Sequence, residues 1–161
     1  MVPGRRQILP GVGNGAAGGG TMRARVVWSG RGMRFKGRAE AKPWVAIHIP
    51  EDTEPPEGST PMELLLIGAL ACTATDVASI LRKGRSKPEA ITVEGQADRA
   101  KAYPKIFTRV HLTYRIRGAV KEQAARRAVD LSNEKYCSAM ITLKRAGARI
   151  TTDIALEPAR T

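Results

Sequence analysis

The sequence predicts an α+β fold, and three observations support this prediction. Segments near both ends of the chain alternate apolar and polar residues, which is the period-two pattern of half-buried strands. Between them lies a long apolar stretch that includes residues 64–72, where no side chain is polar. Two later segments repeat apolar residues at helical spacing. We therefore expect strands that wrap around one central, buried helix.

The first residues of the chain differ in composition from the rest. Residues 1–21 are rich in glycine and lack hydrophobic periodicity, so we expect a disordered leader or tag-like segment that adds nothing to stability. The chain has 161 residues, of which 42% are hydrophobic, enough for one domain with a real core. We expect residues 22–161 to form that domain.

Three short strands are expected before the central helix. Residues 22–28 form the first, because every second residue there is apolar. Residues 30–38 and 43–49 follow as the second and third strands. Residues 50–59 are polar and rich in proline, and they predict a loop that leads into the helix.

The central helix is expected to begin at Pro61 and to end near Lys83. Thr60 stands at the N-cap and Glu63 at the third helical position, which together form a capping box. Gly84 follows the last turn, where a helix commonly stops. The first half of this helix is apolar on nearly every face, which predicts that it is buried. A second subunit is needed to cover it, so we expect a homodimer.

The second half of the chain predicts five further elements. In order, they are a hairpin of strands over 90–100 and 105–118, helices over 120–131 and 132–147, and a strand over 148–156. In the second hairpin strand, the side chains of Val110, Leu112, Tyr114 and Ile116 are expected to point inward. We expect Asn133 to cap the last helix.

Composition narrows the possible partners and location. The net charge of +12 raises the question of nucleic acid, but basic residues are spread along the chain and the aromatic residues form no stacking platform. We therefore expect no nucleic-acid partner. The longest apolar run has nine residues, fewer than the roughly 20 that cross a bilayer, so we expect no membrane span. Two cysteines without an export signal predict a cytoplasmic protein.

One cysteine of the central helix has an acidic neighbour. Asp76 follows Cys72 by four residues, which places both side chains on one face of a helix. Three roles for Asp76 are open. The carboxylate could disfavour a Cys72 thiolate by repulsion, accept a hydrogen bond from a strand or pair with an arginine across a dimer, or move protons during a reaction.

Two motifs together resemble the osmotically inducible protein C / organic hydroperoxide resistance (OsmC/Ohr) family. They are "STPMELLLIGALACTATDV", with Cys72 late in the helix, and "AVDLSNEKYCS", with Cys137 at the opening of a later helix. The resemblance covers Met22 to about Glu157. It implies an intertwined homodimer of α+β subunits, with Cys72 as the peroxidatic and Cys137 as the resolving cysteine. Organic hydroperoxides would be reduced through a sulfenic acid and a disulfide, which a cellular dithiol recycles.

The sequence departs from the family in the groups around the thiol. Family peroxidases use a glutamate near the start of this helix, paired with an arginine from the N-terminal strands. Here Met62 follows Pro61, and Glu63 comes one position late, where the capping box already explains it. Arg31 and Arg34 both lie in the corresponding strand segment. We prefer Arg34, because it falls inside the second strand.

No cofactor is expected, and two functions remain open. His48 and His111 fall on the outward phase of their strands, and no cysteine or histidine pair has metal-ligand spacing, so no metal is expected. The first function is a dithiol-dependent peroxidase for organic or lipid hydroperoxides. The alternative is a non-catalytic binding module that holds a small lipophilic ligand at the dimer interface, with Cys72 as a lining residue.

Overall fold

The computed structural model describes residues 21–51 and 53–160 of the chain. These residues form six strands, three α-helices and one π-helical turn, so the α+β prediction is confirmed. They divide into two compact units, one that ends at Ser59 and one that begins at Thr60. The predicted leader lies outside the described residues apart from Thr21.

The first unit is a small antiparallel sheet in the order β1-β2-β3. Its strands are β1 (Ala24–Trp28), β2 (Arg34–Ala39) and β3 (Val45–His48), as the alternating pattern predicts. The turn between β1 and β2 needs glycine, because Gly30 and Gly32 have φ values of 78° and 47° in the left-handed region. The indole N–H of Trp28 donates to the carbonyl of Gly32 over 2.9 Å and closes this turn.

One face of this sheet is apolar. Cα partners in adjacent strands share a face, and the register joins Trp28 to Phe35 and Phe35 to Ile47. Val26 and Val45 are both partners of Gly37, so they continue the same face. Val26, Trp28 and Val45 are exposed in the single chain. Exposed apolar faces of this kind are uncommon on monomeric proteins and mark interaction sites.

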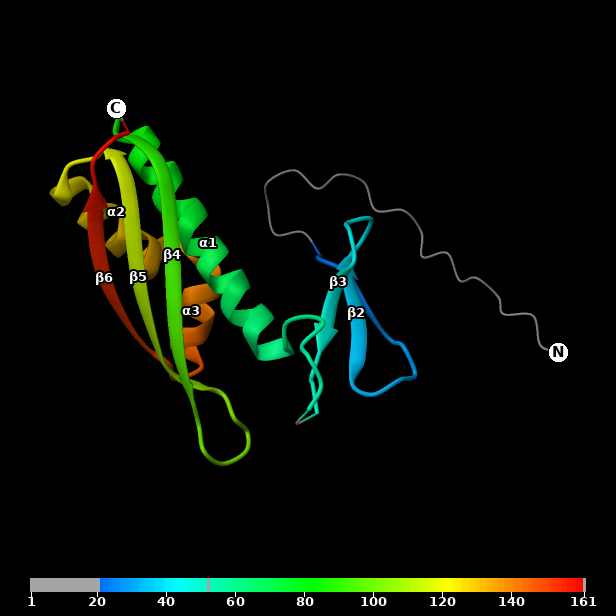
Figure 1. The fold of residues 1–161 in the computed structure, drawn as a ribbon. Helices are drawn as coiled ribbons and strands as arrows, with labels where there is room; N and C mark the ends of the chain where they lie inside the picture. Colours follow the sequence, from blue (N-terminus) through cyan, green and yellow to red (C-terminus); the bar gives the residue numbers. More distant parts are fainter. Residues whose placement is uncertain (1–20, 52, 161) are drawn as a thin grey trace. The chain divides into compact units, whose positions relative to one another are not determined.

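The second unit consists of a three-stranded sheet with helices on one face (Figure 1). Its elements are α1 (Pro61–Lys83), β4 (Lys87–Arg99), β5 (Phe107–Ala119), α2 (Glu122–Leu131), the π-helical turn η1 (Ser132–Tyr136), α3 (Ser138–Arg145) and β6 (Arg149–Glu157). β4 and β5 form the predicted hairpin. β6 pairs with β5 in parallel, after α2, η1 and α3 have carried the chain across the helical face.

The core of the second unit lies between this sheet and the helices α1, α2 and α3. The side chains predicted to point inward from β5 are all buried; they are Val110, Leu112, Tyr114 and Ile116. The buried side of α1 is a single stripe at a spacing of four residues, made of Ala69, Thr73, Val77 and Leu81. Packing of this stripe against the sheet fixes the position of the helix.

Away from this stripe, α1 is partly exposed in the single chain. Leu65 and Ile67 in its first half keep 46% and 51% of their surface exposed. The sequence predicts burial on nearly every face with a second subunit supplying part of the cover, and the single chain covers only the side of α1 that packs against the rest of the unit. The exposed residues are an unpaired apolar surface of the single chain.

The start of α1 has the predicted capping box. The backbone N–H of Thr60 donates to the Glu63 carboxylate over 2.7 Å, and the N–H of Glu63 donates to the Thr60 hydroxyl over 3.4 Å. These bonds satisfy two N–H groups that have no partner inside the helix. They also lower the pKa of the Glu63 carboxyl, because its ionised form accepts the Thr60 bonds.

By length and composition alone, α1 is also a candidate membrane span. The candidate span is longer than the nine-residue apolar run, because the residues that follow the run are also mostly apolar and carry few charges. Core helices of soluble proteins pass the same test. Two polar residues in the middle of α1, Thr73 and Asp76, hydrogen-bond to Ser132 of η1, as expected for a helix that packs against protein.

The region of the second cysteine differs from the single helix predicted over 132–147. A π-helical turn is followed by an extended residue, Cys137, with φ −73° and ψ 93°, and only then by α3. Cys137 itself is the N-cap, because its sulfur accepts the N–H of Met140 over 3.5 Å. Asn133 is therefore not a cap. Its amide donates instead to the hydroxyl of Tyr114 over 3.2 Å, inside the core.

Candidate functional site

The second unit brings both thiols and one acid together. Cys72 and Asp76 lie on successive turns of α1, and Cys137 reaches them from the start of α3. The two sulfurs and a carboxylate oxygen of Asp76 all lie within 4.8 Å of one another. Both cysteines are free thiols; Cys137 is buried, whereas Cys72 and Asp76 are half-buried. Three of the five predicted site residues therefore form one cluster, with Cys72 as the accessible sulfur.

The surroundings of Cys137 keep its thiol protonated. Burial raises its pKa to about 12, and the N–H of Met140 opposes this rise by donating to the sulfur. The neighbouring Cys72 and Asp76 add to the rise, because negative charge on either of them disfavours a second anion. Cys137 is thus a poor nucleophile on its own, since the thiolate is the reactive form of cysteine.

A chain of buried hydrogen bonds extends from Asp76 into the core. The Ser132 hydroxyl donates to the Asp76 carboxylate over 3.3 Å and lies 2.9 Å from the hydroxyl of Thr73. The Thr73 hydroxyl is 2.7 Å from that of Tyr114, which also accepts from the amide of Asn133. Burial raises the pKa of Tyr114, so its hydroxyl remains a proton donor. The network ties α1 to β5 and to the segment that carries Cys137.

This network supports one of the roles considered for Asp76, that of a hydrogen-bond acceptor. Of the three roles that the sequence leaves open, that of hydrogen-bond acceptor has a visible donor, Ser132. The donor lies on η1 rather than on a strand. Within the described part of the second unit, Asp76 has no ion pair, because the salt bridges there join other residues.

The π-helical turn sets the position of Cys137. The N–H of Cys137 donates to the carbonyl of Ser132, five residues earlier, over 2.8 Å. The hydroxyl of the same Ser132 contacts α1 through Thr73 and Asp76. One residue therefore fixes the approach of the second thiol to the first through both its backbone and its side chain. Turns of this kind are rare and frequently occur at functional sites.

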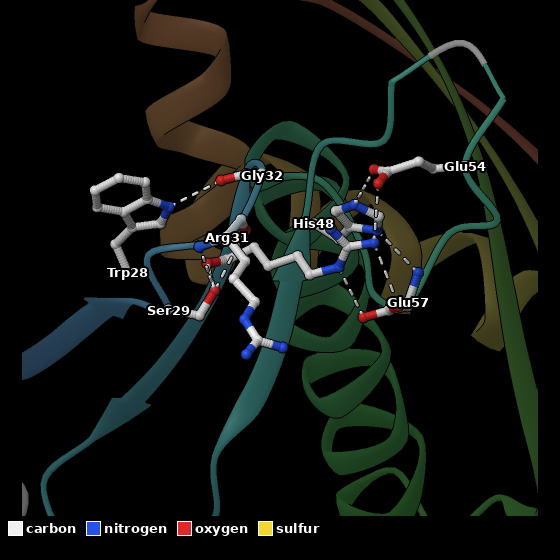
Figure 2. A network of polar contacts seen from close by, with 8 residues as sticks. Trp28, Ser29, Arg31, Gly32, His48, Glu54 and Glu57 are labelled. Carbon is white, nitrogen blue, oxygen red and sulfur yellow. Dashed lines mark hydrogen bonds and ion pairs between the residues drawn. The ribbon is translucent and has the colours of Figure 1, made fainter.

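Arg34 belongs to a polar cluster in the first unit. Figure 2 labels three other members of this cluster, His48, Glu54 and Glu57. The guanidinium of Arg34 contacts the Glu57 carboxylate over 3.0 Å and the Glu54 carboxylate over 3.1 Å. These hydrogen bonds, first to Glu57 and then to Glu54, raise the pKa of Arg34. In return, the bond from Arg34 lowers the pKa of Glu54. The carboxylates that hold this arginine come from the loop before α1, and Glu63 is not one of them.

His48 lies inside the same cluster, which corrects a sequence prediction. The alternation of the strand predicts an outward side chain, but His48 is 1% exposed. The backbone N–H of Glu57 donates to its Nδ1 over 3.1 Å, and its Nε2 lies 3.3 Å from the Glu54 carboxylate. The loop that follows β3 folds over the ring, so the polar phase of the strand is covered. His111 is half-buried and bonds to Thr151 over 2.8 Å.

The other two residues considered from the sequence have local roles. Glu63 caps α1, and its carboxylate is engaged by Thr60. Arg31 lies in the turn after β1, where its N–H donates to the Ser29 hydroxyl over 3.4 Å. Between the two arginines, only Arg34 has an ion pair among the described residues.

Sequence reasoning missed several polar residues beside the predicted ones. Ser132, Thr73 and Tyr114 were overlooked because each is an ordinary core or helix residue in the sequence pattern. Glu54 and Glu57 were not predicted, because a polar, proline-rich loop is expected to be exposed to solvent. One feature of the sequence does point to Glu54 and Glu57. Two closely spaced acids before a helix, in a basic chain, are placed to pair with an arginine.

Comparison with known proteins identifies the family. The family model for OsmC-like protein matches residues 53–153. Protein YhfA of Escherichia coli (strain K12) is 36% identical over 126 residues, which are 78% of this chain and 91% of YhfA.

Solved structures agree with this assignment. A hypothetical protein from Aquifex aeolicus VF5 is 27% identical, with a TM-score of 0.72 over 86% of this chain and 98% of that one. The organic hydroperoxide resistance protein OhrB of Bacillus subtilis is 16% identical, with a TM-score of 0.64 over 84% of this chain and 98% of its own, and it shows the fold alone. With the family model covering more than half of its residues and YhfA similar along most of its length, this chain belongs to the OsmC-like protein family.

Proposed function

We propose that this protein reduces organic hydroperoxides, with Cys72 as the attacking thiol and Cys137 as the resolving thiol. The observation that carries the proposal is the cluster of both sulfurs and the Asp76 carboxylate within 4.8 Å. A distant relative of the same fold, from Bacillus subtilis, bears the name of an organic hydroperoxide resistance protein. A shared fold does not by itself give a reaction, so the proposal depends on the thiols of this chain, and its substrate is left to experiment.

The reaction takes three steps. The Cys72 sulfur attacks the outer oxygen of the hydroperoxide, the O–O bond breaks, and an alcohol leaves as Cys72 becomes a sulfenic acid. The Cys137 thiol then displaces water from that sulfenic acid, and a disulfide forms. A cellular dithiol reduces the disulfide, returns two protons and two electrons to the cysteines, and is itself oxidised to a disulfide.

Asp76 is proposed to move the protons of these steps. A carboxylate oxygen of Asp76 lies within 4.8 Å of the Cys72 sulfur. After a small approach it would accept the Cys72 proton as the sulfur attacks and return it to the departing alkoxide. In the second step it can accept the proton of Cys137, whose buried thiol does not ionise by itself. Ser132 holds the carboxylate in place through its hydrogen bond.

Two cysteine variants test this division of roles. Cys72→Ser should abolish consumption of a bulky organic hydroperoxide, because the attacking sulfur is gone. Cys137→Ser should reduce one equivalent per chain and then stop, because nothing resolves the sulfenic acid. Peroxide consumption can be followed with a dithiol present, and the disulfide by intact mass after the dithiol is removed.

One result would end the enzyme proposal. If the wild-type protein consumed no organic hydroperoxide with any dithiol tried and formed no disulfide after peroxide treatment, the thiols would not be redox-active. The binding module for a small lipophilic ligand would then be the better proposal, and thermal stabilisation by apolar ligands would be its test.

A further inference from the structure

The cluster of Cys72, Asp76 and Cys137 has a second use that does not depend on peroxide chemistry. We infer that in the reduced protein these three residues form a binding site for a soft divalent cation of the zinc type. The inference rests on the kinds of atom present, on their spacing and on the residues that hold them. It stands whether or not the protein proves to be a peroxidase.

The three atoms match the ligand set of zinc. Two thiolates and one carboxylate are accepted zinc ligands, and the sulfurs disfavour magnesium and calcium. Bonds of about 2.3 Å to sulfur and 2.0 Å to oxygen in a tetrahedral site place the ligating atoms about 3.5–3.8 Å apart. The observed atoms lie within 4.8 Å of one another, so a contraction of at most about 1.3 Å closes the site.

The spacings of cysteine and histidine in the sequence do not predict a metal site. The structure adds Asp76 one helical turn after Cys72, and Cys137 from a separate helix. A pair of ligands at a spacing of four residues on one helix is the same device that places two histidines on a zinc ion in metalloproteases. The third ligand comes from a distant part of the sequence, which a local motif cannot show.

Two of the three candidate ligands also accept hydrogen bonds from neighbouring groups, as ligands in metal sites commonly do. Ser132 donates to the Asp76 carboxylate over 3.3 Å, and the N–H of Met140 donates to the Cys137 sulfur over 3.5 Å. Such donors orient the side chains that bind a metal ion and stabilise their charged forms. The second unit supplies no ion pair to Asp76 among its described residues, so a cation would neutralise a charge that is otherwise unpaired.

Three protein ligands leave a fourth position for water, and Cys72 and Asp76 are half-buried, so the site can exchange its ion with solvent. Binding displaces the two thiol protons, and the ion joins two thiolates and one carboxylate. Oxidation of the pair to a disulfide removes both thiolates. The metal-bound and disulfide forms of the protein are therefore mutually exclusive.

The test measures metal binding in the absence of peroxide. Tag-free, fully reduced protein is titrated with Zn²⁺ against a chromogenic chelator and with Co²⁺ by absorption. We expect one ion per chain and a thiolate-to-cobalt charge-transfer band in the near ultraviolet. Asp76→Asn, which keeps both thiols, should weaken Zn²⁺ binding at least about tenfold, because loss of even an outer-shell partner commonly costs that much.

Two controls make the result specific. Asp130→Asn removes an exposed acid on α2 and should leave the affinity unchanged. Cys72→Ser should abolish the cobalt band with the far-ultraviolet circular dichroism of the fold retained. The inference is overturned if no band forms, if the disulfide form binds Zn²⁺ as tightly as the reduced form, or if Asp76→Asn binds as tightly as the wild type.

Discussion

At the scale of single residues, Asp76 offers the sharpest prediction. If its carboxylate moves protons for the thiols, Asp76→Asn should slow the first reduction of hydroperoxide by about 100-fold, which is the contribution of a typical general base. Rapid mixing of reduced protein with one equivalent of peroxide measures this step. Acceleration instead of slowing would mean that the acid merely repels the Cys72 thiolate.

The buried thiol of Cys137 predicts a pH dependence of stability. Its pKa is raised from 9.0 to about 12, so above pH 9 the unfolded chain releases this proton while the folded chain keeps it. The free energy of unfolding should therefore fall as the pH rises from about 9 towards 12, by at most about 1.4 kcal/mol per pH unit for this group.

Denaturant unfolding at pH 8 and pH 10, in reductant and a chelator, measures this slope. Tyr114 is buried too and its pKa is raised, so it contributes in the same direction at higher pH. Cys137→Ala isolates the cysteine, and its stability should fall less steeply with pH than that of the wild type. Equal slopes would show that Cys137 ionises as readily in the folded protein as in the unfolded one.

Arg34 and Arg31 are a matched pair for testing the arginine that the family resemblance implies. Two carboxylates fix the guanidinium of Arg34, whereas Arg31 contacts Ser29 only through its backbone. If hydroperoxide reduction uses this arginine, Arg34→Ala should lower kcat/KM clearly and Arg31→Ala should leave it unchanged. Steady-state assays with a dithiol provide the comparison, and loss of activity in Arg31→Ala alone would reverse the assignment.

At the scale of elements, variants of the α1 capping box distinguish a structural role of Glu63 from a catalytic one. Thr60→Ala should lower the free energy of unfolding by about 1 kcal/mol, because one N–H at the helix start loses its acceptor. Glu63→Gln keeps the capping geometry, since glutamine serves at this position, and should leave both stability and turnover nearly unchanged. Thermal melts and peroxide assays measure the two effects. A Glu63→Gln protein that is stable but inactive would show that the glutamate is catalytic.

The elements also show where sequence patterns succeed and where they fail. The hairpin of β4 and β5 and the limits of α1 follow from alternation, capping residues and Gly84, which are local signals. The break at Cys137 does not, because a π-helical turn of 5 residues is too short to show an apolar period of its own in the sequence. The burial of His48 was missed for a related reason. It depends on a loop that folds over the strand, which no alternation within the strand reports.

The candidate site shows the same division. Cys72 and Asp76 could be placed together from their spacing on one helix, and Cys137 only through resemblance to a family. Ser132, which links α1 to the second thiol, could not be found from the sequence. Its role arises from a hydrogen bond of its backbone to Cys137 and a contact of its side chain with Asp76, and both depend on the tertiary fold.

At the scale of the whole molecule, the exposed apolar surfaces predict self-association. Leu65 and Ile67 on α1, and Val26 and Trp28 on the first sheet, are all exposed in the single chain. We expect a homodimer at micromolar concentration, because burial of such surfaces is the main driving force of association. Light scattering in moderate salt should give twice the chain mass of 17.4 kDa.

A charge in the apolar surface should dissociate the dimer. Ile67→Glu places a carboxylate where the partner is expected to pack and should shift the measured mass towards that of one chain. Gln123→Glu, on the exposed face of α2, adds the same charge elsewhere and should remain dimeric. A wild-type protein of monomeric mass would contradict the prediction and would leave the apolar face of α1 without its expected cover.

The π-helical turn before Cys137 also determines which changes of chain length this protein tolerates. Each residue of a helix rotates the chain by a large fraction of a turn, about 100° in a regular α-helix. Loss of any one residue of the π-helical turn between Ser132 and Tyr136 would therefore rotate all that follows by a comparable angle. Cys137 would then lie away from Cys72, although Cys72, Asp76 and Cys137 were all still present. The meeting of the two thiols thus depends on the number of residues between α2 and α3 as well as on their identity.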